Sequence, residues 1–142
     1  MTRLPDWQSK LSVFMDEHED GIFGYGRFDC CIFVCNAIQI MTGIDVAGKY
    51  RGTYLTRSGA LRSIEGQTGG KSIGHAVADV TEAFGMRNRP ITEAQRGDVV
   101  SILRPRDISL GIVDLSGERI AVVSIKGLLR IPIAAANSSW QV

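Results

Sequence analysis

The segment from Cys30 to Met41, CCIFVCNAIQIM, would be apolar on nearly every side of a helix, interrupted only by Asn36 and Gln39. A helix that is apolar all round has to be buried, so this segment predicts a central helix enclosed by the rest of the fold. Gly43 is expected to end it, because glycine commonly follows the last turn of a helix. A chain of 142 residues is about one domain, and we expect a single domain over residues 1–142.

Other helices are predicted in the first half of the chain. Pro5 and the apolar spacing that follows it predict an amphipathic helix that ends before Gly21. A short helix is expected from about Ser58 to Ile64. A further helix is expected over KSIGHAVADVTEAFG, closing at Gly85.

From Gly97 onward the apolar pattern changes to a period of two. Four short runs, DVVSIL, SLGIVDL, RIAVVSI and LLRIPI, are separated by RPRD, SGE and KG. They predict four strands joined by tight turns, and hence an α+β domain in which a helix packs on a small curled antiparallel sheet, a half-barrel. The C-terminal segment AANSSWQV has almost no charge, and such a tail is often ordered only when something holds it, for which a neighbouring subunit is one candidate.

Charge and hydropathy restrict the partners. With 16 Lys and Arg against 15 Asp and Glu, the net charge of +1 gives no drive to bind a polyanion, so nucleic acid is not an expected partner. No apolar run approaches the 18 or so residues of a spanning helix, and the N-terminus lacks the apolar core of a signal peptide. We expect no membrane insertion and a chain that folds in the cytosol of the cell that makes it.

The remaining charged and aromatic residues have ordinary expected roles. The arginines of the second half and the middle are predicted to be mainly solvated surface, with a partner-binding patch as the alternative: Arg51, Arg57, Arg62, Arg87, Arg89, Arg96, Arg104 and Arg106. The aromatic residues expected in the core or at its rim are Trp7, Tyr50, Tyr54 and Trp140.

The three cysteines, Cys30, Cys31 and Cys35, fall within six residues, which is the wrong distribution for a disulfide framework. Adjacent cysteines on a helix are expected to point apart, so reduced thiols are predicted. The two histidines, His18 and His75, lie in unrelated segments without metal-ligand spacing. We therefore expect no metal site and no cofactor.

Cys30 would lie in the first turn of the central helix, with Asp29 as the N-cap. The positive end of the helix dipole and the free N–H groups there favour a thiolate, which makes Cys30 a candidate nucleophile. Packing is the alternative, because free cysteine is among the most frequently buried residue types.

The wider arrangement resembles the NlpC-type papain-like cysteine peptidases. Those enzymes have a Tyr-x-Trp-Gly loop, Asp-Cys-Ser-Gly at the nucleophile helix, Gly-Asp-Leu-Val on a first sheet strand and His-Val-Gly-Ile on the next. Here the corresponding segments are GYGRFDCC, RGDVVSIL and SLGIVDLSGERIAVVS. Within that superfamily the chain looks closest to a group of small tailed-phage proteins, on the segments LPDW, YRGTYLTRSGAL, RGDVV and KGLLRIPIAAANSSW.

The resemblance places Cys30 on the nucleophile and Asp29 on its cap. The other matching positions are Tyr25 and Gly26 in the loop, and Gly97 and Asp98 at the start of the strand. From the sequence pattern, Asp98 is expected to cap or turn that strand.

Two positions depart from the resemblance. The catalytic histidine is replaced by Ser109, and the loop tyrosine corresponds to Phe23. Serine cannot accept the thiol proton or later protonate a leaving amine near neutral pH. Of the histidines, His75 lies on a predicted helix outside the sheet that would present the base, and His18 lies in the acidic run DEHED, a predicted solvated helix end. Asp114 could orient a base but has none beside it in the pattern.

The resemblance therefore implies an interaction protein of a phage tail tip or baseplate hub, located in the virion and in contact with other tail proteins, with its peptidase chemistry degraded. The alternative is an active cysteine peptidase or amidase that cuts cell-wall peptides during genome entry, using His75 or a base from a neighbouring subunit. A third possibility is recognition of a cell-wall peptide without cleavage.

Overall fold

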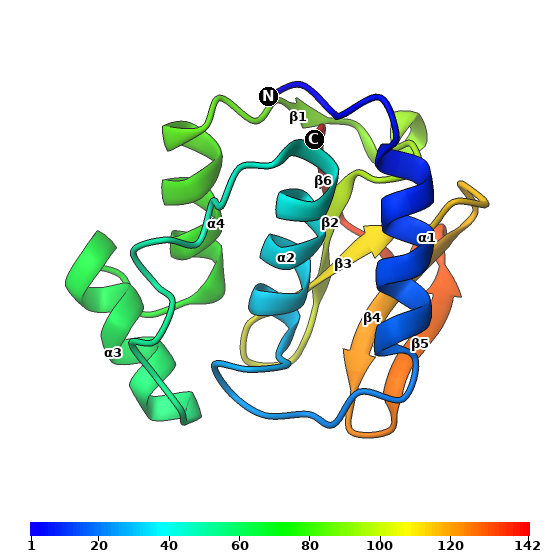
Figure 1. The fold of residues 1–142 in the computed structure, drawn as a ribbon. Coiled ribbons are helices and arrows are strands. Elements are labelled where there is room, and N and C mark those ends of the chain that lie inside the picture. The colour runs from blue at the N-terminus through cyan, green and yellow to red at the C-terminus, as the bar shows by residue number, and fades with distance from the viewer.

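The computed structural model describes residues 1–142 and shows an α+β fold with four helices and a six-stranded antiparallel sheet (Figure 1). The helices are α1 (Trp7–His18), α2 (Cys30–Thr42), α3 (Arg57–Thr68) and α4 (Ile73–Ala83). The strands are β1 (Asn88–Arg89), β2 (Val99–Leu103), β3 (Ile108–Val113), β4 (Arg119–Ser124), β5 (Gly127–Pro132) and β6 (Ser138–Trp140). Their order in the sheet is β1-β6-β2-β3-β4-β5.

The predicted α+β class and the four helices of the first half are confirmed. α3 is longer than expected, because its apolar pattern stops at Ile64 whereas the helix continues to Thr68. Gly69 then takes the left-handed conformation that ends it, with φ of 81°. The end of α3 is thus determined by a glycine that can reverse the chain, and not by the last buried side chain.

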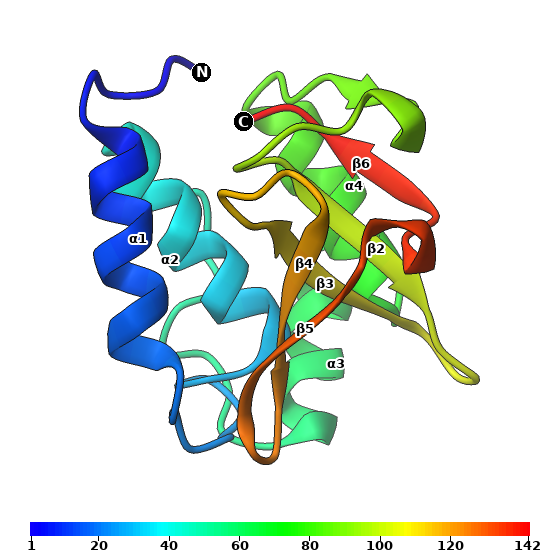
Figure 2. The ribbon, with the colours of Figure 1, turned by 90° about the vertical axis from the view of Figure 1, so that its right-hand side faces the viewer.

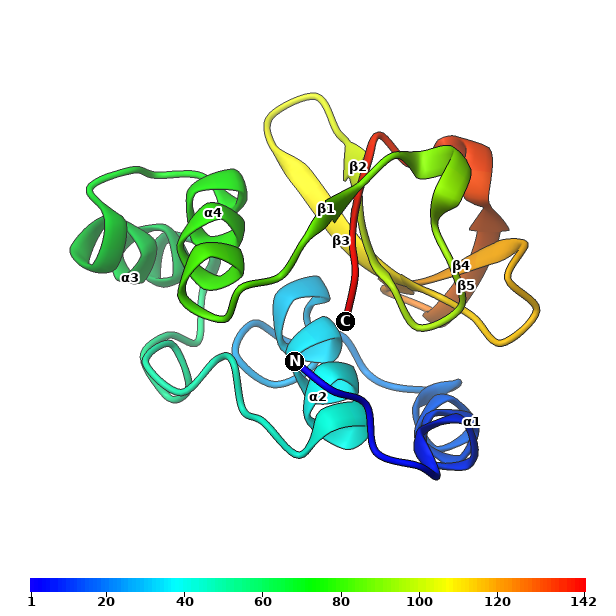
Figure 3. The same cartoon turned by 90° about the horizontal axis from the view of Figure 1, so that it is seen from above.

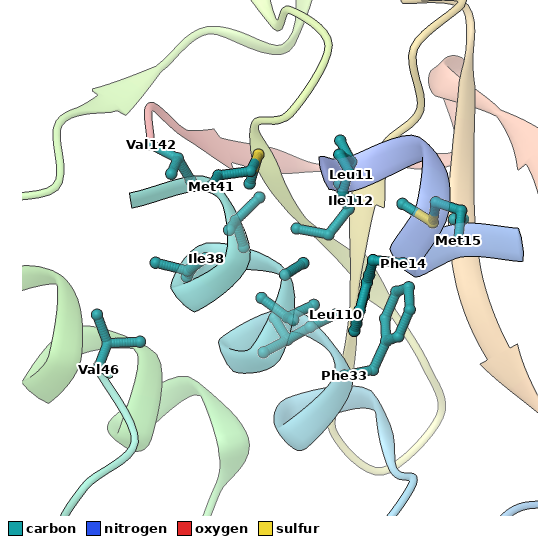
Figure 4. Close-up of a cluster of buried hydrophobic side chains, with 14 of the residues drawn as sticks. Leu11, Phe14, Met15, Phe33, Ile38, Met41, Val46, Leu110, Ile112 and Val142 are labelled. Atoms are coloured by element: carbon teal, nitrogen blue, oxygen red, sulfur yellow. The ribbon is translucent and has the colours of Figure 1, made fainter. Parts of the chain in front are cut away.

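The helix α2 occupies the centre, as its sequence predicts. It packs against α1 and against the sheet. The helix α4 lies on the side of α2 that faces away from α1, and α3 lies beyond α4 (Figures 2 and 3). Side chains from α1, α2 and the sheet meet in one core, which includes Leu11, Phe33, Met41 and Ile112, all at most 1% exposed (Figure 4). Burial of this core therefore fixes where the N-terminus of α2 lies relative to β3.

The sheet buries both of its faces, which explains its nearly continuous apolar runs. On β2, Val99 faces the helical core whereas Val100 belongs to a second cluster inside the curl of the sheet. On β4, Ala121 packs toward the helices and its neighbours Ile120 and Val122 pack into the curl. This alternation is that of a strand buried on both sides, and the sheet is antiparallel, as predicted.

The strands β1 and β6 were not predicted. β6 pairs with β2 on one side and with β1 on the other, so the C-terminal segment is ordered by the chain's own sheet. Val142 is 5% exposed and its carbonyl oxygen accepts a 2.9 Å hydrogen bond from Nε of Arg3, so both chain ends lie together (Figure 1). The chain's own strands therefore hold this tail, because its backbone is hydrogen-bonded between β1 and β2.

Asp98 is a further correction. It does close a turn, since it accepts from the backbone N–H of Gln95, but it is also fully buried between two guanidinium groups. Its carboxylate accepts from Arg3 at 2.9 Å and from Arg89 at 3.0 Å. Arg89 was expected on the solvated surface, but its side chain is 15% exposed because it neutralises this buried carboxylate.

None of the four helices combines the length and the apolar character needed to cross a lipid bilayer.

Candidate functional site

The N-terminus of α2 is organised by Asp29, which is 4% exposed. One carboxylate oxygen caps the helix by accepting from the backbone N–H of Ile32 at 2.8 Å, as predicted. The other oxygen accepts from the backbone N–H of Gly26 at 2.7 Å and from the hydroxyl of Tyr54 at 2.7 Å. A single buried side chain thereby joins the helix to two loops that form the site.

Gly26 explains the glycine-aromatic-glycine loop. Its φ is 79°, and a Cβ at this position would collide with the backbone carbonyl oxygen of Tyr54. Only glycine combines the left-handed conformation with this close approach. Next to it, the rings of Phe23 and Tyr25 meet edge to face with centroids 5.0 Å apart, so the loop forms an aromatic rim.

The sulfurs of Cys30 and Cys31 are 3.9 Å apart, so the expectation that adjacent cysteines point apart is wrong. At the first turn of a helix, two successive side chains can both turn toward one cleft, and here both line it. The separation is far longer than the roughly 2.05 Å of a disulfide. All three cysteines are free thiols, as predicted.

The two thiols differ in their tendency to ionise. A hydrogen bond from the Cys31 thiol, and another from the backbone N–H of Leu110, hold the pKa of Cys30 below its ordinary value. Burial and the carboxylates of Asp29 and Asp107 oppose this lowering of the pKa. The same contact with Cys30, together with burial, raises the pKa of Cys31 well above its ordinary value. Of the two sulfurs, Cys30 is the one whose surroundings favour the thiolate.

Cys35, one turn further along α2, does not belong to the reactive site. Burial raises its pKa to about 12, so it remains a thiol at physiological pH. It contacts the main core, where it packs as a small apolar side chain.

Cys30 opens into a cleft of about 560 Å³, a volume typical of ligand sites. The walls come from the 22–29 loop, α3, the start of α4, the β2–β3 hairpin and β4. The lining residues are Phe23, Tyr25, Asp29, Cys30, Cys31, Tyr54, Arg57, Ala60, Leu61, Ile64, Ile73, Ala76, Arg104, Pro105, Arg106, Asp107, Ile108, Ser109 and Val123.

Ser109 lies on β3 and lines the same cleft as Cys30. Its hydroxyl accepts a 3.1 Å hydrogen bond from Nε of Arg104. The next residue, Leu110, is the one whose backbone contributes to the lowered pKa of Cys30. The strand position that the resemblance assigns to a base therefore lies at the cysteine's cleft, but it carries a hydroxyl that is paired with an arginine.

Neither histidine lines the cleft. His75 is exposed in the first turn of α4, where its Nδ1 lies 2.6 Å from the hydroxyl of Ser72, the N-cap of that helix. His18 was predicted at a solvated helix end but is half-buried, with its ring 4.3 Å from that of Phe14 and 5.8 Å from that of Phe28. Its aromatic neighbours cover the ring because α1 packs against the loop that leads to α2.

Two further carboxylates are held by other partners, and of these only Asp107 lines the cleft. Asp114, which was considered as an orienting group, accepts from Ser116 and lies 3.6 Å from Nε of Arg130. Asp107, which sequence reasoning missed, accepts from the backbone N–H of Ile73 at 2.9 Å and so ties the hairpin to the start of α4. Neither carboxylate orients an imidazole.

Tyr54 is the other residue whose role the sequence did not reveal, since it was expected only as a core or rim aromatic. Burial raises its pKa, and the Asp29 carboxylate raises it further, so the hydroxyl stays protonated and donates. It comes from a loop 25 residues after Asp29, and no local pattern links the two positions.

The cleft offers a pair of thiols. Of the polar groups that line it, the Tyr54 hydroxyl stays protonated and the Asp107 carboxylate is bonded to backbone N–H groups. No group of three or more His, Cys, Asp or Glu side chains is placed to hold a metal ion. The cleft contains a nucleophile with a lowered pKa but no side chain that accepts its proton and returns it to a leaving amine.

The fold and site define an α+β protein with a cysteine at the mouth of a buried helix, open to a cleft. The family model described as Domain of unknown function (DUF6950) matches residues 2–142, so the chain belongs to that family over nearly its whole length. No curated protein matches the sequence.

Proposed function

We propose that this chain is an NlpC-type papain-like domain that has lost its peptidase chemistry and acts as a structural and interaction protein in the tail tip or baseplate hub of a phage. The observation that carries the proposal is the content of the cleft: Cys30 and Ser109 both line it, and no histidine does. The fold supports the papain-like part of the proposal. The buried helix α2 carries Cys30 and precedes the main strands of the sheet, and β3 lines the same cleft as Cys30.

Loss of the base has a large expected effect on catalysis. General acid and base assistance is worth about 10² to 10⁴ in rate, and an amide leaving group needs a proton that Ser109 cannot supply. The lowered pKa of Cys30 does not depend on a histidine, because its causes are the contact with the Cys31 thiol and the backbone of Leu110. A reactive sulfur is thus compatible with an inactive peptidase.

The virion location rests on the sequence resemblance to small tailed-phage proteins. The segments that carry it, YRGTYLTRSGAL and KGLLRIPIAAANSSW, form the loop into α3 and the β5–β6 region. Neither segment contributes a catalytic group, which suits a role in contacts with other tail proteins.

An active cysteine peptidase or amidase, with its base supplied by a neighbouring subunit, is the second candidate. The lowered pKa of Cys30 and its position in an open cleft favour it. His75 is not the base in this arrangement, because it is bound to Ser72 and lies outside the lining.

Hydrolysis of purified cell-wall stem peptides tests the two candidates. We expect the wild-type protein to match its Cys30→Ala variant, and Ser109→His to gain turnover that requires Cys30. Ser9→His, at an exposed position on α1, is the matched control and should gain nothing. Wild-type turnover that disappears in Cys30→Ala would replace the proposal with the peptidase.

Mass spectrometry of purified phage particles tests the location. We expect the chain at a fixed copy number relative to the tail-tip proteins, retained after washing in high salt. Its absence from the particles would exclude a virion role.

A further inference from the structure

The cleft beside Cys30 combines an apolar interior with three arginines at its mouth. Its apolar surface comes from four elements and consists mainly of Ala60, Leu61, Ile64, Ile73, Ala76, Ile108 and Val123. The arginines, Arg57, Arg104 and Arg106, have exposed side chains. None of them takes part in any of the ion pairs within 4.0 Å that the structure contains.

The carboxylates that line the cleft do not neutralise these arginines. Asp29 uses both oxygens for the helix cap, the Gly26 loop and Tyr54. Asp107 uses its oxygens for the backbone N–H groups of Ile73 and Ile108, at 2.9 and 2.8 Å. The guanidinium groups therefore keep most of their donors free for an anion from outside the chain.

The interior offers few partners for a polar ligand. Twelve of the nineteen lining residues are hydrophobic, and the Ser109 hydroxyl is already bonded to Arg104. A peptide in this space would bring backbone N–H and C=O groups, each of which costs free energy when it is buried without a partner. An aliphatic chain would bring none.

We propose that the cleft binds an amphipathic monocarboxylate, an aliphatic acid whose chain lies against α3 and α4. Its carboxylate lies at the mouth, between Arg57 on α3 and the two arginines of the β2–β3 hairpin. Such binding needs no chemistry at Cys30 and does not depend on the proposed virion role. It assigns a ligand to the cleft and a binding role to the three arginines that have no ion-pair partner in the chain.

Isothermal titration with decanoate, octanoate, decanol and the dipeptide N-acetyl-Leu-Leu tests the ligand class. We expect saturable binding of decanoate, and an affinity for octanoate about 4- to 16-fold lower, because each of the two missing CH₂ groups contributes about two- to fourfold. Decanol, which lacks the charge, should bind at least fivefold more weakly than decanoate. Equal affinities for decanol and decanoate, tighter binding of the dipeptide, or no saturable binding of decanoate would overturn the proposal.

The double variant Arg104→Gln/Arg106→Gln tests the arginines. We expect it to bind decanoate about 5- to 20-fold more weakly while its circular dichroism is unchanged, because both residues are exposed. Arg62→Gln, which removes an exposed arginine of α3 outside the cleft lining, is the matched control and should bind as the wild type does. An unchanged affinity in the double variant, or an equal loss in the control, would contradict the assignment. The stem-peptide assay is independent of both results, so failure of this inference and failure of the proposed function are distinguishable.

Discussion

Asp29 is the residue whose replacement tests most of the site at once. Its carboxylate caps α2, holds the Gly26 loop and receives the Tyr54 hydroxyl, with three hydrogen bonds of 2.7 to 2.8 Å. Asp29→Ala removes all three acceptor contacts from a position that is 4% exposed.

The expected cost follows from these contacts. Loss of an N-cap side chain costs about 1 kcal/mol, within a range of about 0.5–2. The two other donors, the N–H of Gly26 and the O–H of Tyr54, lose their partner in a largely buried setting, at about 1–3 kcal/mol each. Because the loops can relax and admit water, we expect the free energy of unfolding to fall by about 3–5 kcal/mol rather than by the full sum.

Urea denaturation followed by circular dichroism measures this change. Asp6→Ala is the matched control, because Asp6 occupies the N-cap position of α1, makes no side-chain cap hydrogen bond and has a side chain that is 59% exposed. The control should change the free energy of unfolding by no more than about 0.5 kcal/mol. A similar small effect in both variants would refute the role given to Asp29.

Replacement of Asp29 should also change the pKa of Cys30. The Asp29 carboxylate raises the pKa of Cys30, so its removal should lower that pKa further. The thiolate forms as the pH rises through the pKa, so the midpoint of iodoacetamide alkylation at Cys30 should move to lower pH. Asp29→Asn, which keeps an acceptor for the helix N–H, is the milder variant for this measurement. A midpoint that moves upward in a folded variant would contradict the electrostatic argument.

Three further outcomes are expected. Cys31→Ala should raise the pKa of Cys30, whereas Cys31→Ser keeps an O–H donor and should preserve most of the lowering; equal alkylation midpoints, with peptide mapping to identify the modified residue, would exclude Cys31 as the donor. Asp98→Ala should lower the free energy of unfolding in urea by about 3–5 kcal/mol, because it strands two guanidinium groups; a cost below about 1 kcal/mol would count against a structural role for the pair. Gly127→Ala should lower the Tm more than Gly117→Ala does. Both glycines have a positive φ, 96° and 75°, but only a Cβ at position 127 would collide with a backbone carbonyl oxygen, that of Glu19 directly after α1. Equal shifts in Tm would show that this close approach does not matter.

The sequence determined the features that depend on local periodicity. The apolar run from Cys30 onward required a buried helix, Asp29 directly before it could cap the first turn, and alternating apolar residues predicted β2 to β5. These are confirmed because burial and capping act over a few residues along the chain. The position of Cys30 in the first turn, and hence its access to the helix terminus, followed from the same pattern.

Which distant groups meet depends on how the helices and strands pack in three dimensions. Tyr54 reaches Asp29 across 25 residues, Asp107 ties the hairpin to α4, and the C-terminal strand enters the sheet between β1 and β2. The sulfur pair at Cys30 and Cys31 depends on side-chain directions at a helix end facing a cleft. None of these contacts has a periodic signature, because each arises from packing of whole elements whose relative placement is determined by the common core.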